Sequence, residues 1–333
     1  MDRRPNVTKQ HERRRRAARR RRRAVTTSLL LLVVVVVGAV VLTEPGSSTP
    51  EGSGRSLDPA LFADGSCVAF APTAGDNGET VFLDAGHGGI DPGGVGTTES
   101  GATIDEATET LPVELAVMGL LRAKGFRVVV SRTTDNTVLR LSPADESGNE
   151  LSLTGSHDDV AVRDVCANDA HAQVLVGIYY DAGASSENAG SLTAYDAARP
   201  FAAANLRLAT LVQRDVVADM DAQGWAIPDD GVQPDGSLGS FVGDPEDGGI
   251  ATEAADYQHL LLLGPAAPGF FTTPSQMPGA VIEPLYLTDP YEGSIAASSR
   301  GQQVIAQGIA TAIEQFLAPK GPVSGSAPTA TSG

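Results

Sequence analysis

The sequence T-V-F-L-D-A-G-H-G-G-I-D-P-G-G-V-G, residues 80–96, joins a short apolar run to a glycine-rich turn. Residues 81–83 are typical of a short buried strand. The glycines on both sides of His87 permit positive φ angles and let the backbone approach a ligand closely. Asp84 and His87 therefore stand at the carboxyl end of a strand, where open α/β sheets hold their ligand crevices. Because one histidine is also compatible with a plain turn, a function for it depends on the rest of the chain.

Two hydrophobic patterns alternate along the chain beyond this stretch. Short apolar runs predict strands, and apolar residues at helical spacing predict amphipathic helices. The predicted strands lie at 126–130, 172–180, 260–263 and 280–282, and the predicted helices at 111–125, 158–171, 197–220 and 295–317. Residues 136–157 and 221–257 are polar and loop-like. This alternation indicates an α/β domain with a largely parallel sheet.

The charge of the chain is distributed very unevenly. The 333 residues include 24 Lys and Arg against 41 Asp and Glu, a formal net charge of −17. Residues 1–23 hold 12 basic and 2 acidic residues (+10), so the remainder holds 12 basic and 39 acidic residues (−27). A body this acidic is a poor match for the phosphate backbone of nucleic acid, and we expect no nucleic-acid partner.

The basic tail precedes an uncharged run at residues 24–43. Twenty apolar residues span a bilayer as one helix, and the preceding arginines favour a cytoplasmic N-terminus. We therefore expect a transmembrane signal-anchor in a single-pass protein of the cell membrane, with the following domain on the outer side. Cleavage of this segment as a signal peptide is the alternative and would make the protein secreted. The predicted organisation is a cytoplasmic tail at 1–23, the anchor at 24–43, a Pro/Gly/Ser linker at 44–58, a folded domain at 59–318 and a disordered tail at 319–333.

The chain contains two cysteines, Cys67 and Cys166. An even number of cysteines in an exported domain favours a disulfide. We expect this bond to tie the segment before the first strand to the helix at 158–171. Two buried free thiols are the alternative.

Several motifs in order resemble one family, the zinc-dependent N-acetylmuramoyl-L-alanine amidases of the cell-wall type. The resemblance covers residue 80 to about 318. It rests on L-D-A-G-H-G-G-I-D-P-G at 83–93, E-A-T-E-T-L at 106–111, R-V-V-V-S-R-T-T-D at 127–135, R-D-V-C-A-N at 163–168 and A-V-I-E-P-L-Y-L-T-D at 280–289. The resemblance implies a twisted six-stranded sheet flanked by helices. It also implies peptidoglycan as the substrate, cut at the amide between the lactyl group of muramic acid and L-alanine.

The family's functional residues map onto particular positions. The resemblance implies that His87 and Glu106 bind zinc and that Glu283 is the catalytic carboxylate, with Glu109 as an alternative register for Glu106. Zinc held by three protein ligands keeps a water in the fourth position and lowers its pKa to ~7. A glutamate beside that water can accept its proton and pass it to the leaving amine.

The third zinc ligand is where the sequence departs from the family. The family has a histidine at the position of Tyr179 in G-I-Y-Y-D-A-G, residues 177–183. A phenol is a weaker zinc ligand than an imidazole. Asp181 is the other candidate, because side chains two residues apart on a strand point to the same side. The remaining candidates, His157, His171 and His259, are expected to be surface residues.

Three functions are compatible with this pattern. The first is an active amidase whose metal site is completed by Tyr179 or Asp181. The second is an amidase-like domain that has lost hydrolysis and binds peptidoglycan or regulates another wall enzyme. The third is a hydrolase of a different amide or ester on the same scaffold. Retention of His87, Glu106 and Glu283 favours the first function, and the missing histidine favours the second.

Overall fold

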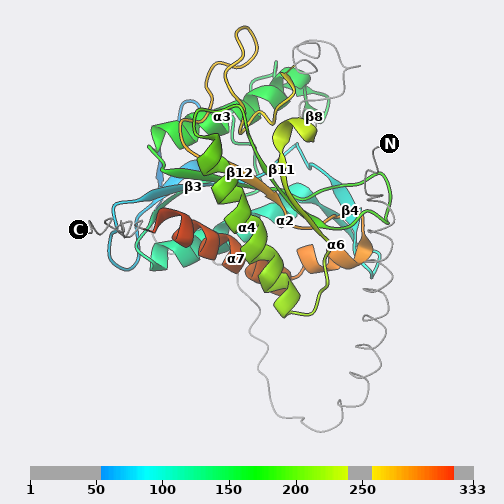
Figure 1. The fold of residues 1–333 in the computed structure, drawn as a ribbon. Helices are drawn as coiled ribbons and strands as arrows, with labels where there is room; N and C mark the ends of the chain where they lie inside the picture. Colours follow the sequence, from blue (N-terminus) through cyan, green and yellow to red (C-terminus); the bar gives the residue numbers. More distant parts are fainter. Residues whose placement is uncertain (1–53, 239–256, 319–333) are drawn as a thin grey trace, which may run out of the picture.

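A computed structural model describes residues 54–238 and 257–318, and its centre is one sheet of eight strands (Figure 1). The strand order is β1-β2-β6-β3-β9-β12-β10-β11. The bounds are β1 Arg55–Ser56, β2 Ser66–Phe70, β6 Arg127–Arg132, β3 Thr80–Ala85, β9 Val174–Ile178, β12 Gly279–Glu283, β10 Ser191–Tyr195 and β11 Asp229–Pro234. The predicted α/β class is confirmed, and the predicted number of six strands is wrong. The extra strands lie towards the edges, where β1 has two residues and β11 has the polar sequence D-D-G-V-Q-P.

The middle of the sheet is parallel. β3 pairs in parallel with β6 and β9, and β9 pairs in parallel with β12. β10 is antiparallel to β12 but parallel to β11. The carboxyl ends of β3, β9 and β12 therefore meet at one edge of the sheet, which is the usual place for a site in such folds.

Helices cover both faces of the sheet (Figure 1). Alternation along β3 directs Val81 and Leu83 into the core shared with α2, α4 and α7, and Phe82 into the core on the side of α3. The helices are α2 Glu106–Ala123, α3 Leu153–Asp169, α4 Ala202–Ala222, α6 Pro290–Ala296 and α7 Ser299–Leu317, with a short 3₁₀ helix η1 at Asp235–Ser237. Two small hairpins lie outside the main sheet, β4 Val95–Thr97 with β5 Thr103–Asp105, and β7 Glu146–Ser147 with β8 Glu150–Leu151.

Side-chain capping moves two helix boundaries from their predicted places. The helix predicted from residue 111 begins at Glu106, because the Asp105 carboxylate caps it by accepting from the Thr108 amide at 2.9 Å. The helix predicted at 295–317 is two helices, since Ser298 caps α7 by accepting from the Gly301 amide at 2.9 Å. The first change places Glu106 in the opening turn of α2.

The strand predicted at 260–263 is absent from the described structure. Its four leucines are buried, at 1–3% exposed, but the backbone turns there. The carbonyl of Leu260 accepts from the amides of Leu263 at 3.0 Å and Gly264 at 2.8 Å. An apolar run of four residues indicates burial and leaves the backbone conformation open.

A disulfide joins Cys67 in β2 to Cys166 in α3, which confirms the predicted pairing. The bond fixes the helix on this face of the sheet to an antiparallel strand near the sheet's edge. The described chain also enters the sheet before the predicted domain start, because Arg55 and Ser56 pair with β2.

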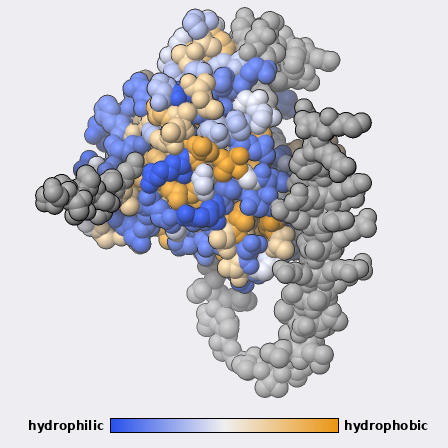
Figure 2. All heavy atoms as spheres, in the orientation of Figure 1, coloured by the Kyte–Doolittle hydropathy of each residue, from blue (hydrophilic) through white to orange (hydrophobic). Residues whose placement is uncertain are grey.

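The N-terminal predictions are largely outside the described residues. The tail at 1–23 and the anchor at 24–43 both lie outside them. The C-terminal tail at 319–333 does so as well. Within residues 54–238 and 257–318, each helix is too short or too polar to cross a membrane. The face shown in Figure 2 is mainly hydrophilic, with hydrophobic residues in small separate groups.

Candidate functional site

His87 follows β3 in a backbone conformation that the surrounding glycines make possible. Its φ is 60°, in the left-handed region, and Gly88 follows at 135°. A Cβ on Gly93 would lie 2.5 Å from the His87 ring. The close approach of this glycine therefore leaves the imidazole little freedom to move.

The His87 ring lies between two carboxylates. Nδ1 is 2.8 Å from Asp91 Oδ2, and Nε2 is 3.2 Å from Glu106 Oε2. Glu106 is itself held by backbone amides, since Oε1 accepts from Tyr180 at 2.8 Å and Oε2 from Gly94 at 3.0 Å. A carboxylate on the far nitrogen of an imidazole is the usual orienting partner of a metal-binding histidine.

The charge around His87 favours a cation at this position. Burial alone would lower the pKa of His87, but the negative charges of Glu106 and Asp91 outweigh it and raise the pKa to about 10. A divalent metal could take the place of that proton. Two ligands at ~2.1 Å from one zinc in a tetrahedral site lie ~3.4 Å apart. The separation of 3.2 Å between His87 Nε2 and Glu106 Oε2 fits two zinc ligands.

Glu283 and Asp181 lie at the ends of neighbouring strands. Glu283 ends β12, and Asp181 follows β9 and bridges to Tyr286. Burial raises the pKa of Glu283 to about 8, and the charges of Asp181 and Glu106 act in the same direction. Burial also raises the pKa of Asp181, with a further contribution from Glu106. A carboxyl group with a pKa near neutrality suits a general acid or base.

Tyr179 is directed away from the His87–Glu106 pair. Its hydroxyl donates to Asp84 Oδ2 at 3.0 Å, while its ring lies edge-on to His87 with centroids 5.6 Å apart. Arg163 donates to the other oxygen of Asp84 at 2.6 Å and to Asp159 at 2.6 Å. The Tyr179 hydroxyl therefore belongs to a buried network centred on Asp84.

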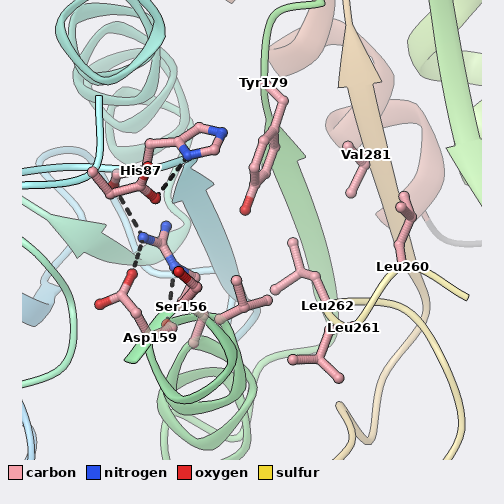
Figure 3. A pocket seen from close by; sticks show the side chains of 11 residues that line it. His87, Ser156, Asp159, Tyr179, Leu260, Leu261, Leu262 and Val281 are labelled. Carbon is pink, nitrogen blue, oxygen red and sulfur yellow. Dashed lines mark hydrogen bonds and ion pairs between the residues drawn. The ribbon is translucent and has the colours of Figure 1, made fainter. Parts of the chain in front are cut away.

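Figure 3 shows a pocket that His87 and Tyr179 border and that Glu106, Asp181 and Glu283 do not line. His87 and Tyr179 lie on one side, Ser156 and Asp159 of α3 lie below, and Val281 comes from β12. Leu260, Leu261 and Leu262, the segment wrongly predicted as a strand, form the opposite wall. The pocket thus has charged groups on one side and an apolar wall on the other.

The described residues do not bring a third carboxylate or imidazole close to both His87 and Glu106. Among the described residues, three possible metal ligands have their ligand atoms within 4.8 Å of one another at one other place. These are Asp196, Asp235 and His259. A third ligand from Asp181 would need its side chain to move. The arrangement provides two positioned donors for a metal and a raised-pKa carboxyl group beside them.

The alternative residues are accounted for in other ways. Glu109 faces α7 and accepts from Gln302 at 2.9 Å, whereas Glu106 contacts His87. His171 is exposed, as predicted. The surface prediction is wrong for His157, which lies within α3 and packs 4.8 Å from the Phe270 ring, because that helix begins earlier than predicted.

Two residues of the site, Asp91 and Arg163, were not predicted from the sequence. Asp91 orients His87, and its position four residues later in the same glycine-rich turn is the signal that could have identified it. Arg163 lies in the R-D-V-C-A-N motif but contacts Asp84 across 79 residues. The motif marks such a residue as important, and its partner is visible only in the fold.

The folded domain is similar to solved structures of one kind. The CwlD amidase from Clostridioides difficile, solved in complex with the GerS lipoprotein, is 20% identical with a TM-score of 0.50, and the match covers 72% of this chain and 98% of that chain. An N-acetylmuramoyl-L-alanine amidase from Clostridium difficile 630 is 24% identical with a TM-score of 0.49, covering 74% and 100%. At 20% identity, the likeness to the CwlD amidase shows the fold alone.

A search of the curated proteins finds no match. The family model described as N-acetylmuramoyl-L-alanine amidase matches residues 81–315. This range includes His87, Glu106, Tyr179, Asp181 and Glu283, and it is more than half of the chain. The chain therefore belongs to the N-acetylmuramoyl-L-alanine amidase family.

Proposed function

We propose that this protein is a peptidoglycan hydrolase that cleaves the amide between the muramic acid lactyl group and L-alanine. The observation that carries the proposal is the pair His87 and Glu106, 3.2 Å apart and oriented by further contacts, with Glu283 at the end of β12 on the same edge of the sheet. Family membership supports the reaction class. The substrate follows from the family's activity.

The proposed cofactor is zinc, bound by His87 and Glu106. When bound, zinc supplies a Lewis acid and a water of lowered pKa. Asp91 holds His87 Nδ1, which directs Nε2 towards the metal position. Glu283 accepts a proton from the attacking water and delivers it to the departing amine nitrogen, a role that fits its pKa of about 8.

Asp181 is the proposed third ligand. It follows β9, and its charge interacts with both Glu106 and Glu283. Tyr179 is the less suitable candidate, because its hydroxyl is hydrogen-bonded to Asp84 and burial raises its pKa well above the ordinary value. A phenol that resists ionisation is a poor zinc donor.

The proposed location is the outer side of the cell membrane, where the substrate lies. Support comes from the uncharged run at 24–43 behind a tail with 12 basic residues. The disulfide between Cys67 and Cys166 is also typical of an exported domain. Residues 24–43 would then anchor the hydrolase beside the cell wall, or release it if they are cleaved.

The test uses the full-length protein, purified in detergent, with purified peptidoglycan. Release of stem peptides should stop with a chelator and return with added zinc. His87→Ala should lower the zinc content by about one ion per chain. Glu283→Gln should reduce release by about 10²–10⁴-fold while zinc content and circular dichroism stay unchanged. The exposed Glu187→Gln serves as the matched control.

A second function is supported by one specific observation. The Tyr179 hydroxyl is hydrogen-bonded to Asp84. In the described structure the candidate metal site therefore has two close ligands, His87 and Glu106, rather than three. A domain with this arrangement could bind peptidoglycan without cutting it. In that case, the wild-type protein would sediment with peptidoglycan but release no stem peptide at any zinc concentration. That result would refute the hydrolase proposal.

A further inference from the structure

A second group of possible metal ligands lies at the other end of the sheet. Asp196 follows β10, and Asp235 follows β11 as the first residue of η1. Because β10 and β11 are parallel, their carboxyl ends bring these two residues together. His259 joins them from the chain that leads into the leucine wall of the pocket. The three residues come from three separate segments of the sequence.

The distances within this group suit a shared ion. His259 Nδ1 is 2.8 Å from Asp196 Oδ2 and 3.6 Å from Asp235 Oδ2. Two ligands at ~2.1 Å from one metal can be at most ~4.2 Å apart, so both separations allow a common centre. An imidazole with two carboxylates is a donor set that suits zinc and similar transition metals.

The group contains buried polar atoms without hydrogen-bond partners. Asp196 is fully buried, and its Oδ2 lies 2.8 Å from His259 Nδ1, a close contact in which neither atom has a hydrogen bond of suitable geometry. The other oxygen of Asp196 is occupied, accepting from the Ala198 amide at 2.6 Å and the Arg199 amide at 2.9 Å. A buried carboxylate oxygen normally has a partner, and a bound cation would provide one.

The charges near the group also favour a divalent ion. Two of its three members are buried carboxylic acid side chains, and the third is the partly buried imidazole of His259. Arg199 lies nearby, but its guanidinium donates to the carbonyl oxygens of Leu263, Gly264 and Ser275. A divalent cation would balance both carboxylates with a neutral imidazole as the third ligand.

The position of the group links it to the pocket. The Leu260 amide donates to Asp235 Oδ2 at 3.1 Å, next in sequence to His259. Leu260, Leu261 and Leu262 form the wall opposite His87 and Tyr179. An ion at this group would therefore hold the leucine wall against the ends of β10 and β11.

We propose that Asp196, Asp235 and His259 form a second, structural zinc site, separate from the pair at His87 and Glu106. Three protein ligands leave one position for a water. The site would stabilise the pocket wall and take no part in the chemistry. It stands independently of the proposed hydrolase activity.

The test uses the full-length His87→Ala/Glu106→Gln variant in detergent, so that the first pair cannot bind metal. Zinc titration by calorimetry should give about one ion per chain, and zinc should raise the thermal unfolding midpoint. Adding His259→Gln should weaken binding at least tenfold and remove the thermal shift. Adding His171→Gln, which changes an exposed histidine, should leave both unchanged.

Asp196→Asn provides a second variant that keeps the fold, because the asparagine oxygen can still accept from the Ala198 and Arg199 amides. It should also weaken zinc binding at least tenfold. Two results would overturn the proposal. One is the absence of zinc binding and thermal shift in the His87→Ala/Glu106→Gln variant. The other is binding that neither His259→Gln nor Asp196→Asn weakens.

Discussion

Replacing Tyr179 by phenylalanine removes one hydroxyl group and separates two roles for this residue. In the structure, the hydroxyl donates to Asp84 Oδ2 at 3.0 Å within a buried network. If this is its role, Tyr179→Phe should lower the free energy of unfolding and leave zinc binding at His87 unchanged. If the hydroxyl is instead a zinc ligand in the working enzyme, the same change should weaken zinc binding.

The size of the stability loss follows from what remains around Asp84. A hydrogen bond to a charged group contributes ~1.5–3 kcal/mol. Asp84 is fully buried, but Arg163 still donates to its other oxygen at 2.6 Å, so the carboxylate keeps a cationic partner. We therefore expect a loss of ~2 kcal/mol. For a domain of this size, that corresponds to a fall of about 4–8 °C in Tm.

Tyr180→Phe is a matched control at the next position. The Tyr180 hydroxyl is buried and has no hydrogen-bond partner among the described residues. Removing a buried unsatisfied hydroxyl should leave stability unchanged or raise it by up to ~1 kcal/mol. Of the two adjacent tyrosines, only Tyr179 is therefore expected to lose stability, although the same atom is removed from each.

The assay is urea unfolding followed by tryptophan fluorescence, together with zinc content measured relative to His87→Ala. The reasoning would be refuted if Tyr179→Phe lost the zinc that depends on His87 while its stability equalled that of the wild type. The reasoning would also be refuted if Tyr179→Phe and Tyr180→Phe had the same free energy of unfolding. In the first case, Tyr179 would replace Asp181 as the proposed third ligand.

Burial raises the pKa of Glu109 to about 7 from an ordinary 4.5, so its contribution to stability is present in acid and is lost as pH rises from 4.5 through about 7. In the wild type, Glu109 should lower the free energy of unfolding by at most ~3 kcal/mol between pH 5 and pH 8, and Glu109→Gln should remove this decline. An unchanged pH profile in the variant would contradict the prediction. Breaking the bond between Cys67 and Cys166, 99 residues apart, with the double Ser variant should lower stability by ~4 kcal/mol in urea, and a loss below ~1 kcal/mol would be inconsistent with the loop argument. Asp91→Asn should weaken zinc binding at His87 about 10–100-fold by calorimetry, and wild-type affinity would remove Asp91 from the site.

The central part of the fold was predictable because its signals are local. The apolar run before Asp84, the glycine turn around His87 and the strand that ends at Glu283 each lie within a few consecutive residues. Once these strands are predicted to be parallel, their carboxyl ends are expected at the same edge of the sheet. The edge strand β11 was not predictable because it is polar, and the leucines at 260–263 were mistaken for a strand because they are buried in a turn.

The orientation of side chains was less accessible from the sequence. The sequence singles out Tyr179 as a candidate ligand, but its hydroxyl direction depends on Asp84, 95 residues away, and on Arg163. Asp196 and Asp235 are likewise ordinary residues in the sequence, and only the parallel pairing of β10 with β11 places them in one cluster. Interactions across such separations have no local signature.

The disulfide also determines how the domain tolerates a broken backbone. The covalent loop between Cys67 and Cys166 contains His87 and Glu106, whereas Tyr179, Asp181 and Glu283 lie beyond it. A protease that cuts within the loop, for example at the exposed hairpin of β7 and β8, leaves two pieces that stay joined through sulfur. A cut beyond Cys166 instead releases a fragment carrying Glu283 once the domain unfolds. While the disulfide is intact, the first kind of cut leaves every proposed site residue on one covalent molecule, and the second removes the proposed proton carrier.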